Sequence, residues 1–219
     1  MSITITFNAE NHTYIDNLGR NYISVTQLLK KYYPFDEDAI IGKITKMPTS
    51  KYFGRTKTDI LREWREVSEY GNLVHKSIEN HINDNTPILK EDVTYNCVKQ
   101  FKSLKFNKCI SEKIVFSEKY LIAGSCDLII DQVTHYEIWD IKTNKALDSK
   151  KLLTYSLQLS FYKFFATAVL DKPVKLGGIL WFENFYKFRE KTKMKIVRPI
   201  NCLSEFKMIL DNRLKEITK

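Results

Sequence analysis

Two acidic residues and a lysine interrupt a pair of apolar, β-branched segments near the middle of the sequence. Asp127 lies in the run GSCDLII, and Asp140 and Lys142 lie in the run YEIWDIKT. If the chain turns midway between the two runs, Asp127 lies opposite Asp140 or diagonally next to it. Lys142 projects from the same strand face as Asp140, because side chains alternate along a strand. The sequence therefore predicts that two carboxylates and one ammonium group converge.

This trio is suited to metal-assisted hydrolysis of a phosphodiester bond. Carboxylate oxygens are the ligands that Mg²⁺ prefers, and they also suit Mn²⁺. Such a metal neutralises the phosphate, lowers the pKa of a bound water and stabilises charge in the transition state. The lysine can orient or activate the attacking water, or stabilise the pentavalent phosphorane. The alternative is a structural role, since a buried ion-pair network can also hold a hairpin together.

Further motifs flank this hairpin, and each has an ordinary structural interpretation when taken alone. A histidine or glutamate can simply lie on a helix surface, and an aromatic residue on an apolar helix is usually part of the core. In chain order the motifs are GxxxH (Gly71 and His75), Glu79 one helical turn after His75, Glu112 in the strand before the hairpin, and QxxxY (Gln158 and Tyr162) on the helix after it.

Taken in this order, the motifs resemble those of the RecB-like branch of the PD-(D/E)XK nuclease superfamily. The residues GSCD, which end at Asp127, resemble its GxxD form, and DIKT, which begins at Asp140, resembles its DxKT form. Upstream, SVTQLL from Ser24 is similar to the SVTxLL segment of phage-encoded RecB-like exonucleases and of the mitochondrial genome maintenance exonuclease. The resemblance implies a core of order αβββαβ, a Mg²⁺ or Mn²⁺ cofactor and DNA as the substrate.

The resemblance also implies roles for individual residues. The implied catalytic residues are Asp127, Asp140, Lys142 and Glu112, and the implied metal ligands are His75, Asp127, Asp140 and Ile141. Glu79 is a candidate partner that orients His75, and the helix carrying Gln158 and Tyr162 is expected to contact DNA. Lys145, Lys150 and Lys151 follow the catalytic strand and are candidate phosphate contacts.

The cysteines differ from the pattern of those relatives that hold an iron–sulfur cluster. Such relatives have one upstream cysteine and three closely spaced ones near the C-terminus. Here Cys97, Cys109 and Cys126 all precede Asp127, only Cys202 follows it, and no CxxC pair occurs. We therefore expect no iron–sulfur cluster. The sequence also lacks GxxxxGK[ST], so a helicase, like a single-strand-binding protein, would have to be a separate partner.

The elements that position these residues predict a mixed α/β fold, with one sheet and helices on its faces. A short helix capped by Ser24 or Thr26 runs to Tyr32, and 34–54 is expected to be a loop or flap. We expect an N-terminal extension, 1–70, packed on a nuclease core, 71–219, in one compact domain. The other expected helices are 56–69, 71–82, 93–106, 149–169 and 203–217, and the expected strands are 3–7, 12–15, 21–25, 110–117, 120–130, 135–142, 178–183 and 192–198.

Composition supports a globular protein that binds a polyanion. The 219 residues are 43% hydrophobic, which is enough for a buried core. The net charge of +9 favours nucleic acid, although a lysine-rich genome composition would give the same charge. The apolar runs are too short to cross a bilayer. We expect an intracellular protein with reduced thiols, because the N-terminus shows no signal or transit pattern.

These observations favour an exonuclease that acts on DNA ends or single strands in replication, recombination or repair. A structure- or sequence-specific endonuclease on the same core, or a catalytically silent DNA-binding protein, remains an alternative. A flap over the site would require a DNA end to thread in. The aromatic residues of the N-terminal region could stack single-stranded bases or could pack a lid on the core; they are Tyr32, Tyr33, Phe35, Tyr52, Phe53 and Trp64.

Overall fold

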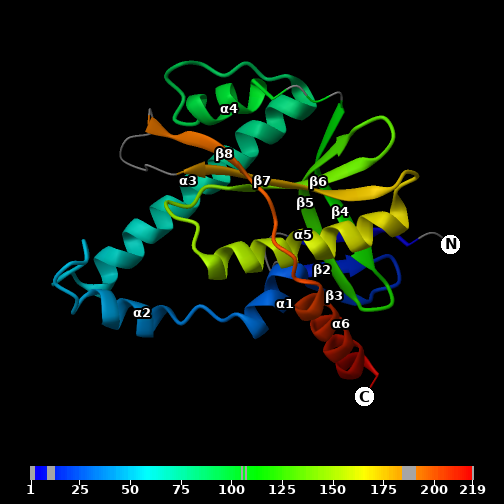
Figure 1. The fold of residues 1–219 in the computed structure, drawn as a ribbon, viewed down its shortest axis with the longest axis horizontal. Coiled ribbons are helices and arrows are strands. Elements are labelled where there is room, and N and C mark those ends of the chain that lie inside the picture. Colours follow the sequence, from blue (N-terminus) through cyan, green and yellow to red (C-terminus); the bar gives the residue numbers. More distant parts are fainter. Residues whose placement is uncertain (1–2, 9–12, 105, 107, 184–190, 219) are drawn as a thin grey trace.

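The computed structural model describes residues 3–8, 13–104, 106, 108–183 and 191–218 (Figure 1). Over these residues, eight strands form one mixed sheet in the order β1-β2-β3-β5-β6-β7-β8, with β4 paired to β5. The strands are β1 (Ile5–Asn8), β2 (Thr13–Asp16), β3 (Asn21–Ser24), β4 (Lys108–Ser117), β5 (Ile122–Asp131), β6 (Tyr136–Lys142), β7 (Val174–Glu183) and β8 (Lys193–Val197). The helices are α1 (Val25–Tyr32), α2 (Glu37–Ile44), α3 (Lys57–Asp84), α4 (Tyr95–Lys102), α5 (Ser149–Val169) and α6 (Leu203–Ile217). The predicted mixed α/β class is confirmed.

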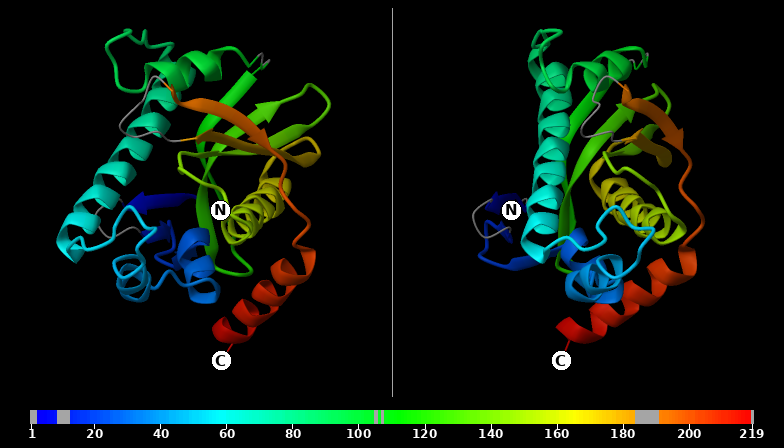
Figure 2. Two further views of the ribbon diagram at one scale, coloured as in Figure 1. Left: turned by 60° about the vertical axis from the view of Figure 1, so that its left-hand side comes forward. Right: turned by 90° about the vertical axis from the view of Figure 1, so that its left-hand side faces the viewer.

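Helices cover both faces of the sheet. Buried residues of α1, α5 and α6 share one hydrophobic core with strands β4 to β7. Buried residues of α3 and α4 form a second core on the other side, against Leu128, Ile141 and Leu180 of the central strands. Figure 2 shows this layering, with α3 along one side of the strands and α5 along the other. None of the described helices is long and apolar enough to cross a membrane.

The central strand β5 changes partner along one of its edges. Ile122 and Ala123 pair in parallel with β3, whereas 128–131 pair antiparallel with β6. The stretch 124–127 lies between these two partners, so Asp127 stands at a fork in the sheet. Leu128 pairs with Trp139, so the next residues along the two strands, Asp127 and Asp140, lie opposite each other. The predicted register of the hairpin is therefore confirmed.

Several helix boundaries follow the local capping signals. Ser24 caps α1 in a complete capping box, in which its side chain accepts from the Gln27 main-chain N–H and the Gln27 side chain accepts from that of Ser24. The ranges predicted for α5 and α6 are confirmed. Within α6, Leu203 is 55% exposed, whereas Ile209 and Leu210 are buried.

Helix α3 corrects the prediction of two helices separated near Gly71. It runs unbroken from Lys57 to Asp84, so the domain boundary predicted at residue 70 falls inside it. Gly71 lies where α3 crosses the end of β6, and a Cβ atom there would be 2.7 Å from Thr143 Oγ1. The GxxxH motif therefore marks a close helix–strand crossing one turn before His75. It does not mark the start of a helix.

The segment 34–54 contains a helix that the sequence did not predict. Asp36 caps α2, because its side chain accepts from the Ala39 main-chain N–H. Within α2, Ile41 is the one buried residue of the helix. A helix of this length with a single buried position leaves almost no apolar periodicity to detect.

Gly177 and Gly178 lie inside a strand that the sequence predicted to begin only at residue 178. Strand β7 runs through both, from Val174 to Glu183. The side chain of Trp139 occupies the space beside them, and a Cβ atom on Gly177 would lie 2.0 Å from Trp139 Nε1. The pairing passes from Ile138–Leu176 to Trp139–Gly178, which leaves Gly177 as the extra residue of a bulge. The two glycines therefore accommodate a large ring inside a continuous strand.

Candidate metal centre

Asp127 is held at the fork of the sheet by the main chain of β6. Its Oδ2 accepts a hydrogen bond of 2.7 Å from the N–H of Ile141 and lies 3.6 Å from Nδ1 of His75. The Ile141 main chain also hydrogen-bonds the His75 ring. The predicted site residues His75, Asp127 and Ile141, which come from α3, β5 and β6, are therefore in mutual contact.

Glu112 joins this group from β4. One ligand atom from each of His75, Glu112 and Asp127 lies within 4.8 Å of the others. Glu112 has a φ of 50°, which L-residues rarely adopt, and it interrupts the ladder opposite Asp127. Ser125 Oγ donates a hydrogen bond of 2.7 Å to Glu112 Oε2. An unusual backbone conformation and a neighbouring hydroxyl thus hold the carboxylate beside the group.

Asp140 and Lys142 form the second part of the site. The Asp140 side chain is fully buried, and its Oδ2 lies 2.6 Å from Lys142 Nζ. Among the described residues, no hydrogen-bond donor reaches Asp140 Oδ1. Lys142 Nζ also lies 4.7 Å from the centroid of the Tyr155 ring, whose hydroxyl donates to Asn144 Oδ1 at 2.7 Å. The lysine is therefore fixed between a carboxylate and an aromatic face.

Burial and mutual repulsion disfavour charge on these carboxyl groups. Burial, together with Asp127, raises the pKa of Asp140 to about 7, and burial raises the pKa of Asp127. Desolvation and the Asp127 charge also raise the pKa of Glu112 to about 7, although this side chain is more exposed and so better screened by water. The cluster therefore has more carboxylates than cationic groups, since the Lys142 ammonium is accompanied by Asp140, Asp127 and Glu112.

His75 and Lys142 have the protonation states that a metal centre needs. Desolvation and the Lys142 charge lower the pKa of His75 to about 4, so the imidazole is neutral near pH 7 and can ligate. Burial opposes the Lys142 ammonium, but Asp140 and Asp127 outweigh it and raise the pKa of Lys142. A neutral imidazole, clustered carboxylates and a buried carboxylate oxygen without a donor fit a divalent cation.

We expect divalent cations to stabilise the protein through this group. At about 100 times the Kd, Mg²⁺ or Mn²⁺ should add about 2.7 kcal/mol, which raises the Tm by about 5–10 °C. Asp127→Asn should remove most of that increase in a thermal unfolding assay. Asp131→Asn is the matched control, because Asp131 lies on the same strand but pairs with Lys172 at its outer end. An equal increase in Asp127→Asn and in the native protein would contradict the assignment.

Gln158 and Tyr162 lie behind β5, inside the protein. They are 9% and 3% exposed, and Gln158 Nε2 donates to Tyr162 Oη at 3.0 Å. A Cβ atom on Gly124 would be 2.6 Å from the Tyr162 ring, so α5 and β5 are in close contact just before Asp127. This position favours a role in holding the site over the direct DNA contact predicted from the sequence.

The remaining predicted residues lie around the site without entering it. Lys76 donates to Glu79 at 2.9 Å, so the partner that the structure gives to Glu79 is this lysine and not His75. Lys145 is exposed in the β6–α5 loop. At the start of α5, Lys150 donates to the Pro34 carbonyl and Lys151 to that of Ala146. Glu79 and the three predicted lysines are therefore not part of the candidate metal-binding group, which contains His75, Glu112 and Asp127.

Three supporting residues were missed by the sequence analysis. Tyr155 lies on the same face of α5 as Gln158 and Tyr162, since the spacing is i, i+3, i+7, and that periodicity was a usable signal. Ser125 gave no such signal, because a serine on an apolar strand is common, and Thr143 was visible only as the last residue of the DIKT motif, with no role attached. Their contacts with Glu112 and Gly71 depend on how β4 and α3 approach, which is a tertiary property.

A family model agrees with this geometry at the level of the superfamily. Residues 98–218 match the family model of the PD-(D/E)XK nuclease superfamily, and this range includes the Asp127, Asp140 and Lys142 positions. No curated protein matches the sequence. Among solved structures, one titled "Crystal structure of SSO0001" aligns with a TM-score of 0.45 and 13% identity, over 90% of this chain and 76% of that chain.

Proposed function

The chain belongs to the PD-(D/E)XK nuclease superfamily, and from this membership we propose that it is a Mg²⁺- or Mn²⁺-dependent deoxyribonuclease of the RecB-like type. The observation that carries the proposal is the group of His75, Glu112 and Asp127 beside the buried Asp140–Lys142 pair. His75, Asp127, Asp140 and the Ile141 main chain would hold the cation. The bound cation would neutralise the phosphate and favour ionisation of the attacking water.

The protein's own groups would orient the reaction around that cation. Lys142 carries a fixed positive charge that can stabilise the developing negative charge on the phosphate or orient the water. Its position depends on Asp140 and on the face of Tyr155, which leave the ammonium little freedom. Glu112 is held by Ser125 at the edge of the group, where it can accept a proton or position the water.

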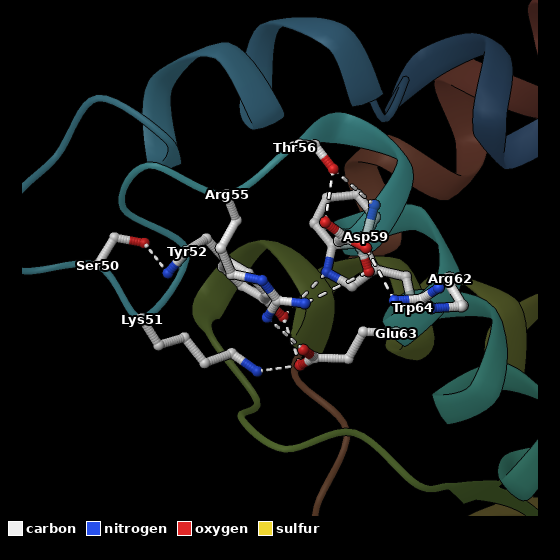
Figure 3. Close-up of polar contacts among 9 residues, drawn as sticks. All are labelled: Ser50, Lys51, Tyr52, Arg55, Thr56, Asp59, Arg62, Glu63 and Trp64. Carbon is white, nitrogen blue, oxygen red and sulfur yellow. Dashed lines mark hydrogen bonds and ion pairs between the residues drawn. The ribbon is translucent and has the colours of Figure 1, made fainter.

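We propose exonuclease action on DNA ends or single strands, in replication, recombination or repair inside the cell. The support is the N-terminal part of the chain, where α2 and the first half of α3 project beyond the sheet (Figure 1). The loop before α3 is fixed to this helix by the Glu63 carboxylate, which accepts from Lys51, Tyr52 and Arg55 (Figure 3). A fixed projection beside the site favours entry of a strand end over lateral binding of a duplex. A helicase or a single-strand-binding protein is the partner that would supply such an end.

The direct test uses labelled linear single-stranded, linear double-stranded and circular DNA, each with Mg²⁺, with Mn²⁺ or with a chelator. We expect metal-dependent loss of the linear substrates, intact circles, and no cutting by Asp140→Ala. Cutting of circles would replace the exonuclease proposal with an endonuclease. Binding without cutting under every condition would leave a silent DNA-binding protein.

A further inference from the structure

Two aromatic rings near the projecting end of α3 are largely exposed to solvent. Phe35, just before α2, is 63% exposed, and Phe53, in the loop before α3, is 56% exposed. The Phe35 ring contacts the half-buried Trp64 of α3 edge-on, with ring centroids 5.8 Å apart. Exposed apolar side chains that contact one another, in contrast to single ones, mark binding surfaces.

Trp64, which contacts the Phe35 ring, is hydrogen-bonded to the loop before α3. Trp64 Nε1 donates to Tyr52 Oη at 3.1 Å, and the Tyr52 hydroxyl donates to Glu63 at 3.1 Å (Figure 3). Arg55 adds a 2.7 Å ion pair to the same carboxylate. Because the Glu63 carboxylate pairs with both Lys51 and Arg55, the two basic groups serve as braces for the loop. This end of α3 therefore offers a ligand an aromatic surface next to a trio of side chains with one net positive charge.

The residue before Phe35 also contacts α5, the helix that follows the strand carrying Asp140 and Lys142. Lys150, at the start of α5, donates a 3.4 Å hydrogen bond to the carbonyl of Pro34, the residue before Phe35. The ring of Phe35 thus contacts α3, which carries His75, and the residue before it contacts the start of α5.

Helix α3 sets the distance between the pair of Phe35 and Trp64 and the metal centre, because it carries both Trp64 and His75. His75 follows Trp64 by eleven positions on α3. Eleven residues span about 16 Å and about three turns, so both side chains lie on the same face. A strand that rises about 3.4 Å per nucleotide covers this distance with about five stacked nucleotides.

We propose that Phe35 and Trp64 form a stacking site for unpaired nucleobases of the strand whose backbone is cut at the metal centre, about five nucleotides away. This inference rests on the proposed function and identifies the substrate as single-stranded DNA. Stacking on aromatic rings accepts any base. It excludes paired bases, whose faces are covered in a duplex. The protein's charge of +9 provides the general attraction for the backbone.

The test compares two strands of equal charge and length: a ten-nucleotide thymidine strand and a ten-residue abasic strand. Binding is measured by fluorescence anisotropy in the Asp140→Ala background, so that nothing is cut. We expect the thymidine strand to bind about five-fold tighter or more. Phe35→Ala should bring this ratio close to one without changing the affinity for the abasic strand. Phe35→Trp should keep the ratio and Phe35→Leu should lose it, which separates stacking from simple packing against Trp64.

The matched control is Phe164→Ala, because Phe164 is a partly exposed phenylalanine (43%) of α5 that packs against Phe206 of α6. Its ratio should equal that of the parent protein. An unchanged ratio in Phe35→Ala, or a ratio near one in the parent, would overturn the stacking site while metal-dependent cutting of DNA still upheld the nuclease. Absence of both binding and cutting would overturn the two proposals together.

Discussion

Replacing Lys142 with alanine is expected to reduce DNA cutting by about 10²–10³-fold or more at saturating metal, while DNA binding stays near that of the native protein. The reason is that a single preorganised positive group at the reacting phosphate has an effect of this size. Lys142 Nζ is fixed 2.6 Å from Asp140 and over the Tyr155 ring, so no water can replace it with the same geometry. Single-turnover cutting rates together with a Kd for DNA separate the chemical step from binding.

The chain supplies a close control for this substitution. Lys172 Nζ donates to both oxygens of Asp131 at 2.8 Å and lies 5.0 Å from the Tyr136 ring centroid. It therefore repeats the lysine–carboxylate–tyrosine arrangement at the β5–β6 turn, away from the candidate cation ligands. Lys172→Ala should cut at the native rate. If Lys142→Ala also cuts within about ten-fold of the native protein, the catalytic assignment of Lys142 is wrong.

Replacing Gly177 with alanine is expected to cause the largest loss of stability of any single methyl group added to the sheet. The new Cβ would overlap the Trp139 ring at 2.0 Å from Nε1, and both residues lie within paired strands that cannot separate independently. Overpacking of this kind costs about 1–3 kcal/mol and occasionally more. Denaturant unfolding should show the loss, and cutting should also fall because Trp139 directly precedes Asp140.

Gly42→Ala is the control for Gly177→Ala. A Cβ atom on Gly42 meets nothing within 4 Å, and the residue lies inside α2. Alanine is the better helix former by about 1 kcal/mol, so this variant should be as stable as the native protein or slightly more stable. Trp139→Leu should relieve part of the damage in Gly177→Ala, which a double-mutant cycle would report as coupling. Stability of Gly177→Ala within about 0.5 kcal/mol of native would show that the ring can move aside.

The parts of the site that sequence alone predicts are those set by local periodicity. The placing of Asp127 opposite Asp140, with Lys142 on the same face, follows from a two-residue period and one short turn, and the register of β5 and β6 confirms it. The boundaries of α5 and α6 also follow from pattern and capping. These features depend on neighbours a few residues apart, which the sequence states directly.

The parts that could not be predicted depend on close approach between distant segments. Glycine often ends a helix or strand, yet Gly71 and Gly177 each lie inside a continuous element. In both cases another side chain fills the space that a Cβ atom would take. The exposed position of Phe35 and the burial of Tyr162 are likewise decided by the packing of α3 and α5. A glycine or an aromatic ring has several structural uses, and only the tertiary arrangement selects one.

The unbroken course of α3 has a consequence for how relatives of this protein could diverge. One rigid rod carries the histidine of the metal centre and the tryptophan at the projecting end. Inserting or deleting a whole turn between them would change the reach of the enzyme along its substrate by about 5.4 Å and leave the chemistry intact. A change of one or two residues would instead rotate the far end out of line. The distance between the aromatic residues and the metal centre should therefore evolve, and be engineered, in discrete steps of one helical turn.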